Sequence, residues 1–559
     1  MRGGFGMSCG RARVRARLGA CAAVAAIAAL GVCVAGCGGG SGGSGGGSGT
    51  AAGGEGSGST AAGGASAGGA YRWLVPTVGA APSVAAENAA RGTSAWRLPG
   101  PASLIGGAAH GAISGYVAEQ AIAPSATQSI YVDAPGAGTV RISVYRMGWY
   151  GGLGGRLVLR SAALRAVRQP PCAHNAQTGL TECDWHATLS FPIPAALASG
   201  VYIAKLRAST GAESDCLFIV RPAAPARVMV QIPTSTYEAY NAWGGDSLYP
   251  GGARQVGATG TDQGVQVSYD RPYESQTGAG QFFIREVAIV RFLERYGYPA
   301  GYTTDASVDS DPAQLRGARA VIDSGHSEYW SARQEQAFAQ ARDGGTSLLF
   351  ISSDKIAWRV RYASAGAASS QAGARGHRII AYKQFASAEP GGREQTGLFP
   401  QGGAELSGSA YDGCITQRVQ APGPPAYRYY DWRPAPSLTP AWLFAGTGIT
   451  AATRIAGIVG YELDERAPAT PAGTAVLGGA SEVACMPETE PSPIHGSAAE
   501  STLYTARSGA LVFATGTLGW LYALSPVPQA SPDVPPAPDP RVVAITRNVL
   551  ERALTRPAG

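Results

Sequence analysis

The stretch AVIDSGHSEYW, residues 320–330, carries a short apolar run that is followed at once by polar and aromatic side chains. Similar apolar runs recur along the second half of the chain, with helical patterns of apolar residues between them. The strand candidates cover residues 227–232, 318–322, 347–351 and 510–514, and the helix candidates cover residues 283–296, 332–342 and 539–554. Buried-type strands that alternate with helices predict a parallel sheet. We therefore expect an α/β domain over residues 223–559, with a β-rich insertion over about residues 400–500.

The part of the chain before this domain has a different pattern. Residues 128–132, 140–145 and 200–206 alternate apolar and polar side chains, and Gly and Pro separate these runs. Period-two runs at short spacing predict an antiparallel β-sandwich, here over residues 71–222. The fold class that we expect is therefore α+β with several domains.

The N-terminus has the layout of an export signal. Five arginines within the first 17 residues precede an apolar run over residues 18–34, which is shorter than the roughly 20 residues that span a membrane. The run ends in VAGC, residues 34–37, which resembles a bacterial lipobox. We expect residues 1–36 to be a signal peptide, Cys37 to be lipidated, and residues 37–70, rich in Gly and Ser, to be a linker. The alternative is an ordinary signal peptide with an incidental cysteine.

These features predict an exported protein that is held by its lipid at the outer face of the cell membrane. None of the 38 acidic residues but five of the 44 basic ones precede Cys37, so the chain after the signal is nearly neutral. A nearly neutral chain gives no reason to expect nucleic-acid binding. Self-association of identical copies is left open.

Five cysteines lie in the folded part, and their number fits an exported protein. Cys172 and Cys183 flank a turn-rich stretch and are the best disulfide pair. Cys414 with Cys485 is a weaker pair, which would leave Cys216 as a free thiol in an apolar run.

Polar side chains follow each predicted strand, at the sheet edge where α/β proteins bind ligands. They cover residues 233–245, 323–330, 352–354 and 515–517. Among them, His326 and Glu328 are two residues apart, so they point the same way in an extended segment. Such a pair can ligate a metal ion or supply a general base. The structural alternative is that His326 caps the following helix and Glu328 is an acid of its first turn.

Two further groups of residues are candidates. Tyr240 and Asn241 belong to an aromatic group with Tyr237 and Trp243, for which residue type alone favours a structural plug. The polar segments at residues 270–273 and 460–464 could hold loops by ion pairs.

A serine nucleophile is a further hypothesis. Ser352 or Ser353 follows an apolar strand, and His326 could be its base. The sequence marks no third group that would orient the histidine.

Several motifs, in this order along the chain, resemble the large subunit of N,N-dimethylformamidase and the family named after its C-terminal region. They are VYRMGWYGG (residues 144–152), AYNAWGG (residues 239–245), YDRPY (residues 269–273), GHSEYW (residues 325–330) and GYE (residues 460–462). The resemblance covers about residues 125–525.

The resemblance implies a β-sandwich joined to a glutamine-amidotransferase-like α/β domain, a small partner subunit, and hydrolysis of a small amide. It also implies a mononuclear iron, Fe3+, held by two tyrosinates and a glutamate, with a histidine, a second glutamate and an asparagine nearby. The residues that we place in these roles are Tyr240, Glu328 and, on spacing, Tyr202 as ligands, His326 and Glu462 beside the iron, and Asn241, Trp243 and Arg271 as substrate contacts.

One position departs from the family pattern. The family's asparagine is replaced by Asp354, which removes an N–H donor, adds negative charge and would weaken oxyanion stabilisation. The leading hypothesis is a surface-anchored, iron-dependent hydrolase of a small amide, with Asp354 in its catalytic group. The alternative is a non-catalytic surface module on the same fold that binds a ligand such as a glycan.

Overall fold

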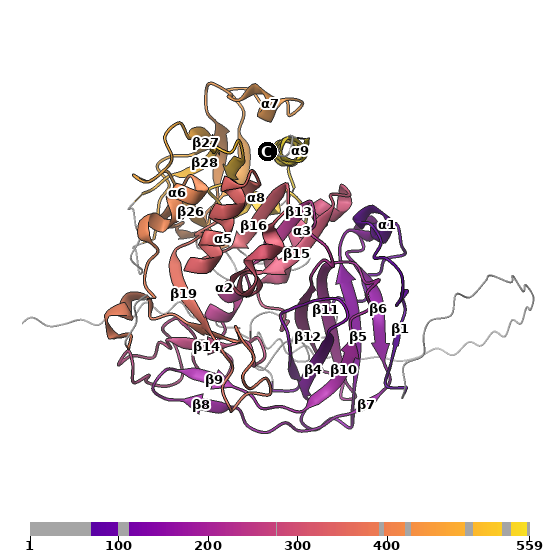
Figure 1. Cartoon of the computed structure of the whole chain (residues 1–559). Helices are drawn as coiled ribbons and strands as arrows, with labels where there is room; N and C mark the ends of the chain where they lie inside the picture. Colours follow the sequence, from indigo (N-terminus) through magenta and orange to yellow (C-terminus); the bar gives the residue numbers. More distant parts are fainter. Residues whose placement is uncertain are drawn as a thin grey trace, which may run out of the picture. The chain divides into compact units, whose positions relative to one another are not determined.

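The computed structural model shows a mixed α+β chain built on several sheets (Figure 1). It describes residues 69–98, 111–274, 277–390, 396–419, 426–486, 496–527 and 538–555. The predicted signal peptide, the predicted lipid site at Cys37 and nearly all of the predicted linker lie outside the described residues. In the described part, none of the helices combines the length and the apolar character needed to cross a membrane.

The first part of the chain forms two sheets that share one core. Their strands are β1 (Tyr71–Trp73), β2 (Ser114–Val117), β3 (Ala121–Ile122), β4 (Thr127–Asp133), β5 (Thr139–Met147), β6 (Gly155–Ser161), β7 (Leu164–Arg165), β10 (Ala187–Pro192), β11 (Gly200–Ala208) and β12 (Glu213–Val220). The larger sheet has the order β1-β6-β5-β11-β12-β3, with β7 beside β5, and the smaller has the order β10-β4-β2. Alternate side chains such as Val144, Phe191 and Phe218 meet in the buried core. The three alternating runs predicted as strands fall in β4, β5 and β11, as expected.

A nine-stranded mixed sheet organises the second part. Its strands are β13 (Val228–Ile232), β15 (Ala300–Thr304), β16 (Ala320–His326), β18 (Ser347–Ser353), β24 (Tyr430–Pro434), β25 (Ile455–Val459), β27 (Ala475–Ala480), β28 (Ala499–Thr505) and β29 (Leu511–Ala514). The order is β15-β13-β16-β18-β29-β28-β27-β24-β25, parallel from β15 to β29 and antiparallel beyond it. The four strands predicted from apolar runs are thus confirmed as members of the parallel part.

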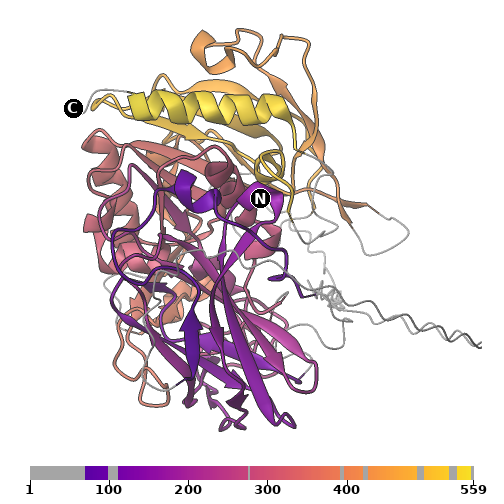
Figure 2. The same ribbon diagram turned by 90° about the vertical axis from the view of Figure 1, so that its right-hand side faces the viewer.

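Helices pack on both faces of the parallel strands. The helices α3 (Val287–Arg295) and α9 (Pro540–Thr555) share a core with Ile322, and Figure 2 shows α9 in yellow. The helix α5 (Ala332–Asp343) shares a different core with Val321. Adjacent residues of a strand point to opposite faces, so a strand covered on both faces is apolar throughout. This is why these strands read as continuous apolar runs.

The described residues between 400 and 500 include several short strands, most of which are antiparallel. β24, β25 and β27 extend the large sheet, and β21 (Ala410–Ile415) pairs with β26 (Glu462–Glu465). The remaining elements are α1 (Val84–Asn88), α2 (Thr234–Ala239), α4 (Asp305–Ser310), α6 (Ala404–Ser407), α7 (Ala441–Phe444), α8 (Gly519–Tyr522), β8 (Ala173–Asn175), β9 (Leu180–Glu182), β14 (Gln266–Ser268), β17 (Tyr329–Ser331), β19 (Trp358–Ala363), β20 (Arg378–Ile380), β22 (Arg418–Val419), β23 (Ala426–Tyr427) and the 3-10 helices η3 (Tyr150–Gly152), η4 (Phe282–Ile284), η5 (Pro312–Leu315), η6 (Lys383–Ala388) and η7 (Pro400–Gly403).

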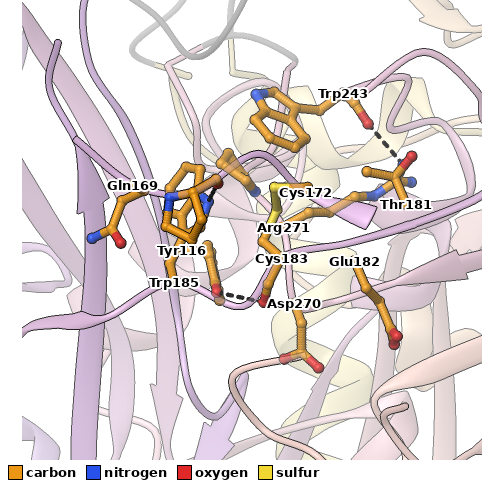
Figure 3. The surroundings of a disulfide bond; sticks show 12 residues. Tyr116, Gln169, Cys172, Thr181, Glu182, Cys183, Trp185, Trp243, Asp270 and Arg271 are labelled. Atoms are coloured by element: carbon orange, nitrogen blue, oxygen red, sulfur yellow. Dashed lines mark hydrogen bonds between the residues drawn. A yellow bond between two sulfur atoms is a disulfide. The ribbon is translucent and has the colours of Figure 1, made fainter. Parts of the chain in front are cut away.

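Both predicted disulfides are present, between Cys172 and Cys183 and between Cys414 and Cys485. Figure 3 shows the surroundings of the first. Cys216 is buried in the core of the two sheets and forms no disulfide with any described residue. The cysteine pattern is therefore confirmed, including the odd thiol.

A buried histidine joins the two parts of the chain. His377 Nδ1 is 2.8 Å from Asp270 Oδ1, and its Nε2 is 3.8 Å from Glu119 Oε1 in the two-sheet part. Burial would lower the pKa of His377, but the carboxylates of Asp270 and Glu119 outweigh burial and raise this pKa to about 10. The folded protein therefore favours the imidazolium.

We expect His377→Asn to lower the free energy of unfolding by about 3–5 kcal/mol at pH 6, because it removes one charge of a buried pair. The folded pKa lies above the ordinary value of 6.5, so the stabilisation is complete below pH 6.5 and is lost as the pH rises through the folded value. Urea unfolding of both proteins from pH 6 to 10 measures this loss. His186→Asn is the control, because His186 is exposed. A loss of stability in His377→Asn that is the same at every pH would contradict the prediction.

Candidate metal centre

His326 lies at the centre of a buried group of carboxylates. Its Nε2 is 3.3 Å from Glu328 Oε2, 3.3 Å from Asp354 Oδ2 and 3.1 Å from Glu462 Oε2. β16 and β18 are parallel neighbours that pair His326 with Ser353, so Asp354 follows at the same edge of the sheet. Glu462 is the first residue of β26. One atom from each of His326, Asp354 and Glu462 lies within 4.8 Å of the others, which is close enough for a shared metal ion.

Two unusual backbone conformations shape this group. Gly325 has a φ of 75°, and a Cβ at this position would overlap the carboxylate of Glu286. Asp354 has a φ of 50°, in the left-handed region that costs a non-glycine residue free energy. The backbone N–H of Asp354 donates to Asp464 Oδ1 at 3.0 Å, and Lys355 Nζ donates to Asp464 Oδ2 at 2.7 Å. These buried contacts hold the turn that carries Asp354.

Two tyrosines adjoin Glu328. Tyr240 Oη donates to Glu328 Oε2 at 3.0 Å. Tyr249 Oη is 2.6 Å from Glu328 Oε1 and 2.7 Å from Tyr240 Oη, and the two phenol rings stack with centroids 4.2 Å apart. Tyr249 belongs to none of the motifs that stand out in the sequence. Its place shortly after Tyr240 in a glycine-rich loop is the signal that could have found it.

Tyr202 does not lie among these side chains, contrary to the expectation from spacing. It belongs to β11, is fully buried in the core of the two sheets and stacks on Phe218 with ring centroids 5.4 Å apart. Its hydroxyl donates to the carbonyl of Ala198 at 2.5 Å. Spacing along the chain cannot tell whether a strand residue faces its own core or a site elsewhere. Tyr249, and not Tyr202, is the second tyrosine beside Tyr240 and Glu328.

Arg271 holds a loop instead of facing the carboxylate group. Its Nε donates to Glu238 Oε1 at 2.7 Å, and its other nitrogens donate to the carbonyls of Asn241, Trp243 and Asp246 at 2.8, 2.8 and 3.1 Å. These carbonyls belong to the loop between Tyr240 and Tyr249, so the guanidinium fixes the shape of the segment that joins the two phenols.

Asn241 and Trp243 also have internal partners. Asn241 Nδ2 donates to the carbonyl of Pro272 at 2.9 Å. The Trp243 ring packs edge-on against Trp185 at 5.9 Å, and Figure 3 shows it near the Cys172–Cys183 disulfide. The contacts of Asn241, Trp243 and Arg271 are therefore those of a structural network, and their predicted role as substrate contacts gains no support.

Burial is the largest cause of the pKa shifts in this group, and nearby charges add to it. Burial, and then the charge of Glu328, raise the pKa of Glu462 well above its usual range, against the opposing effect of Arg285. Burial, and then Arg285 and Lys383, lower the pKa of His326 well below its usual range. An added cation would relieve the repulsion between the carboxylates.

The predicted serine nucleophile lacks its base. Ser352 Oγ donates to Asp323 Oδ2 at 2.8 Å, and Ser353 Oγ donates to the carbonyl of Glu462 at 2.9 Å. His326 Nε2 faces the carboxylates instead. The arrangement is not that of a serine–histidine pair, and the side chains around His326 could instead hold a metal ion.

We expect Arg271→Met to cost about 3–5 kcal/mol of stability, because it leaves Glu238 buried without its counter-charge. The amide of Leu248, which donates to the carbonyl of Ala239, should exchange its hydrogen faster. Denaturant unfolding and hydrogen exchange measure the two effects. Arg254→Met is the control, because Arg254 also donates to this loop but is about half exposed. Unchanged stability with weaker substrate binding would contradict a structural role.

Comparison with protein families gives an assignment for most of the chain. A family model described as N,N-dimethylformamidase beta subunit-like, C-terminal, matches residues 141–533. A comparison with curated proteins finds no match. The matched region includes His326, Glu328, Asp354 and Glu462 and both tyrosines that adjoin them. The chain therefore belongs to the N,N-dimethylformamidase beta subunit-like family.

Proposed function

We propose that the protein hydrolyses the C–N bond of a small amide with the help of an Fe3+ ion held by Tyr240, Tyr249 and Glu328. The observation that carries the proposal is the convergence of two phenol oxygens on one carboxylate, with Tyr249 Oη 2.6 Å and Tyr240 Oη 3.0 Å from Glu328. Family membership supports a hydrolase in general.

The donor atoms fit a hard trivalent cation. Phenol and carboxylate oxygens predominate, and the one nitrogen donor in the group is the imidazole of His326. If every carboxylate and both phenols were ionised they would carry five negative charges, while Arg285 and Lys383 act on the site with two positive ones. A trivalent ion balances the difference. In an empty site the two phenols keep their protons, and three carboxylates against two cations leave one negative charge, which a proton on Glu462, whose pKa is raised, would balance.

The residues around Glu328 can move the protons that amide hydrolysis requires. An Fe3+ ion at this position supplies a Lewis acid that polarises the amide carbonyl and acidifies water. Glu462 Oε2 lies 3.1 Å from His326 Nε2, so a proton that one of them takes from water can pass to the other and on to the leaving nitrogen. Neutral His326 suits this role, because burial and nearby cations lower its pKa.

The proposal places this chemistry outside the cell, with Cys37 lipidated and the protein anchored at the outer face of the membrane. The two disulfides support an oxidising compartment. The family description as a beta subunit suggests a partner subunit. The paired sheets and the partly parallel sheet support a β-sandwich joined to an amidotransferase-like domain.

We expect the purified protein to contain near-stoichiometric iron and to show a tyrosinate-to-iron charge-transfer band. Tyr249→Phe and Tyr240→Phe should weaken or shift the band, and Glu328→Ala should lose both the iron and amide hydrolysis, because each removes a donor. Elemental analysis, visible spectra and an assay with N,N-dimethylformamide measure these effects. Tyr202→Phe is the matched control, since this hydroxyl contacts a carbonyl in the two-sheet core. Protein without metal that binds oligosaccharides would favour the glycan-binding alternative.

Asp354 gives a second test of the mechanism. We expect Asp354→Asn to raise kcat by about 10–100-fold, because an amide restores a donor for the developing oxyanion. Steady-state kinetics at pH 7 measure the change. Asp412→Asn is the control, because burial raises the pKa of Asp412 to about 9 and an amide mimics its protonated form. A lower kcat in Asp354→Asn would show that the carboxylate itself takes part in the reaction.

A further inference from the structure

Lys383 places its ammonium in a cage of aromatic rings beside the candidate metal centre. Its Nζ is 3.6 Å from the ring centroid of Tyr249, 4.8 Å from that of Trp358 and 5.6 Å from that of Tyr329. Only 2% of Lys383 is exposed. A buried ammonium is costly, and ring faces recover part of that cost when water is absent. The shortest of the three contacts is to a phenol of the candidate metal centre.

The backbone at Lys383 is held in an unfavourable conformation. Its φ is 53°, which a residue with a side chain rarely adopts. The preceding residue, Tyr382, donates its backbone N–H to Thr396 Oγ1 at 2.7 Å, and Thr396 in turn donates its hydroxyl to Glu389 at 2.9 Å. Strain of this kind persists where the surrounding structure enforces it, and it is concentrated at functional sites. Here the enforced turn directs the lysine onto the Tyr249 ring.

We propose that Lys383 is a positioning residue for Tyr249. Lys383 holds the phenol ring of Tyr249 in place and sets a fixed positive charge against the face of that ring. The effect on the ring follows from the cage alone, whereas the effect on a bound ion rests on the proposed function. The positive charge of Lys383 also acts on His326. After burial and Arg285, it is the third cause of the lowered pKa of His326. A charge on the ring face acts more strongly on the ring than on an ion beyond the phenol oxygen, since Coulomb energy falls with distance.

The direction of a spectral shift tests this inference. The positive charge lowers the energy of the electrons on the phenolate, so its removal in Lys383→Met should move the tyrosinate-to-iron band to longer wavelength at equal iron content. Lys383→Gln carries the same prediction, so the test does not depend on one variant folding. Lys383→Arg keeps the charge and should restore the band to near its original position. Lys205→Met, which removes a lysine of β11 in the two-sheet part, should leave the band unchanged. An unmoved band in both neutral variants would overturn the proposal.

A second measurement does not depend on iron. In metal-free protein labelled with 3-fluorotyrosine, the 19F resonance of Tyr249, assigned with Tyr249→Phe, should move in Lys383→Met and return towards its original position in Lys383→Arg. The resonance of Tyr202, far from the cage, should stay fixed. If the protein takes up no iron but the Tyr249 resonance moves as expected, the proposed function fails and the role of Lys383 stands. A Tyr249 resonance that is the same in all variants would overturn that role.

Discussion

The burial of several like charges around one imidazole is the constraint on which the second half of the protein depends. Glu328, Asp354 and Glu462 all lie within 3.3 Å of His326 Nε2, and none of them is exposed to the water that would normally stabilise its charge. Such a group costs several kcal/mol per charge unless the structure supplies compensation. Arginine and lysine side chains that are themselves buried provide part of it, and a bound cation would provide the rest.

The group is assembled by two different kinds of structure. The parallel sheet fixes His326 and Asp354, because adjacent strands end together and their backbones are hydrogen-bonded over their length. The two tyrosines instead lie at the two ends of a loop. The buried guanidinium of Arg271 donates hydrogen bonds to three carbonyls of this loop and so holds its shape. Strand ends are rigid and loops are less so. His326 and Asp354 are therefore held by the sheet, whereas Tyr249 depends on Arg271 and Lys383, which hold its loop and its ring.

This division also explains how much could be predicted from the sequence. Apolar runs followed by polar residues indicate strand ends directly, so the parallel strands and the placing of His326 and Glu328 at one sheet edge follow from the pattern. Tyr249 lies in a loop and Lys383 begins the short 3-10 helix η6, and no periodicity in the sequence places either of them. Tyr202 was wrongly placed because spacing does not reveal which core a strand residue faces. For Arg271 the sequence left two roles open, a substrate contact and an ion pair that holds a loop, and the structure shows the second.

Asp354 and Lys383 act on the site in opposite senses. Compared with an asparagine in the same place, Asp354 adds a negative charge, which favours the binding of a cation but weakens the pull of that cation on a carbonyl oxygen. Lys383 sets a positive charge against the Tyr249 ring, which withdraws electron density from the phenol and so restores some of that pull. The electrophilic strength of an ion held here would then depend on both side chains. Lys383 lies in none of the motifs that carry the family resemblance, and Asp354 is a position where this chain departs from the family pattern.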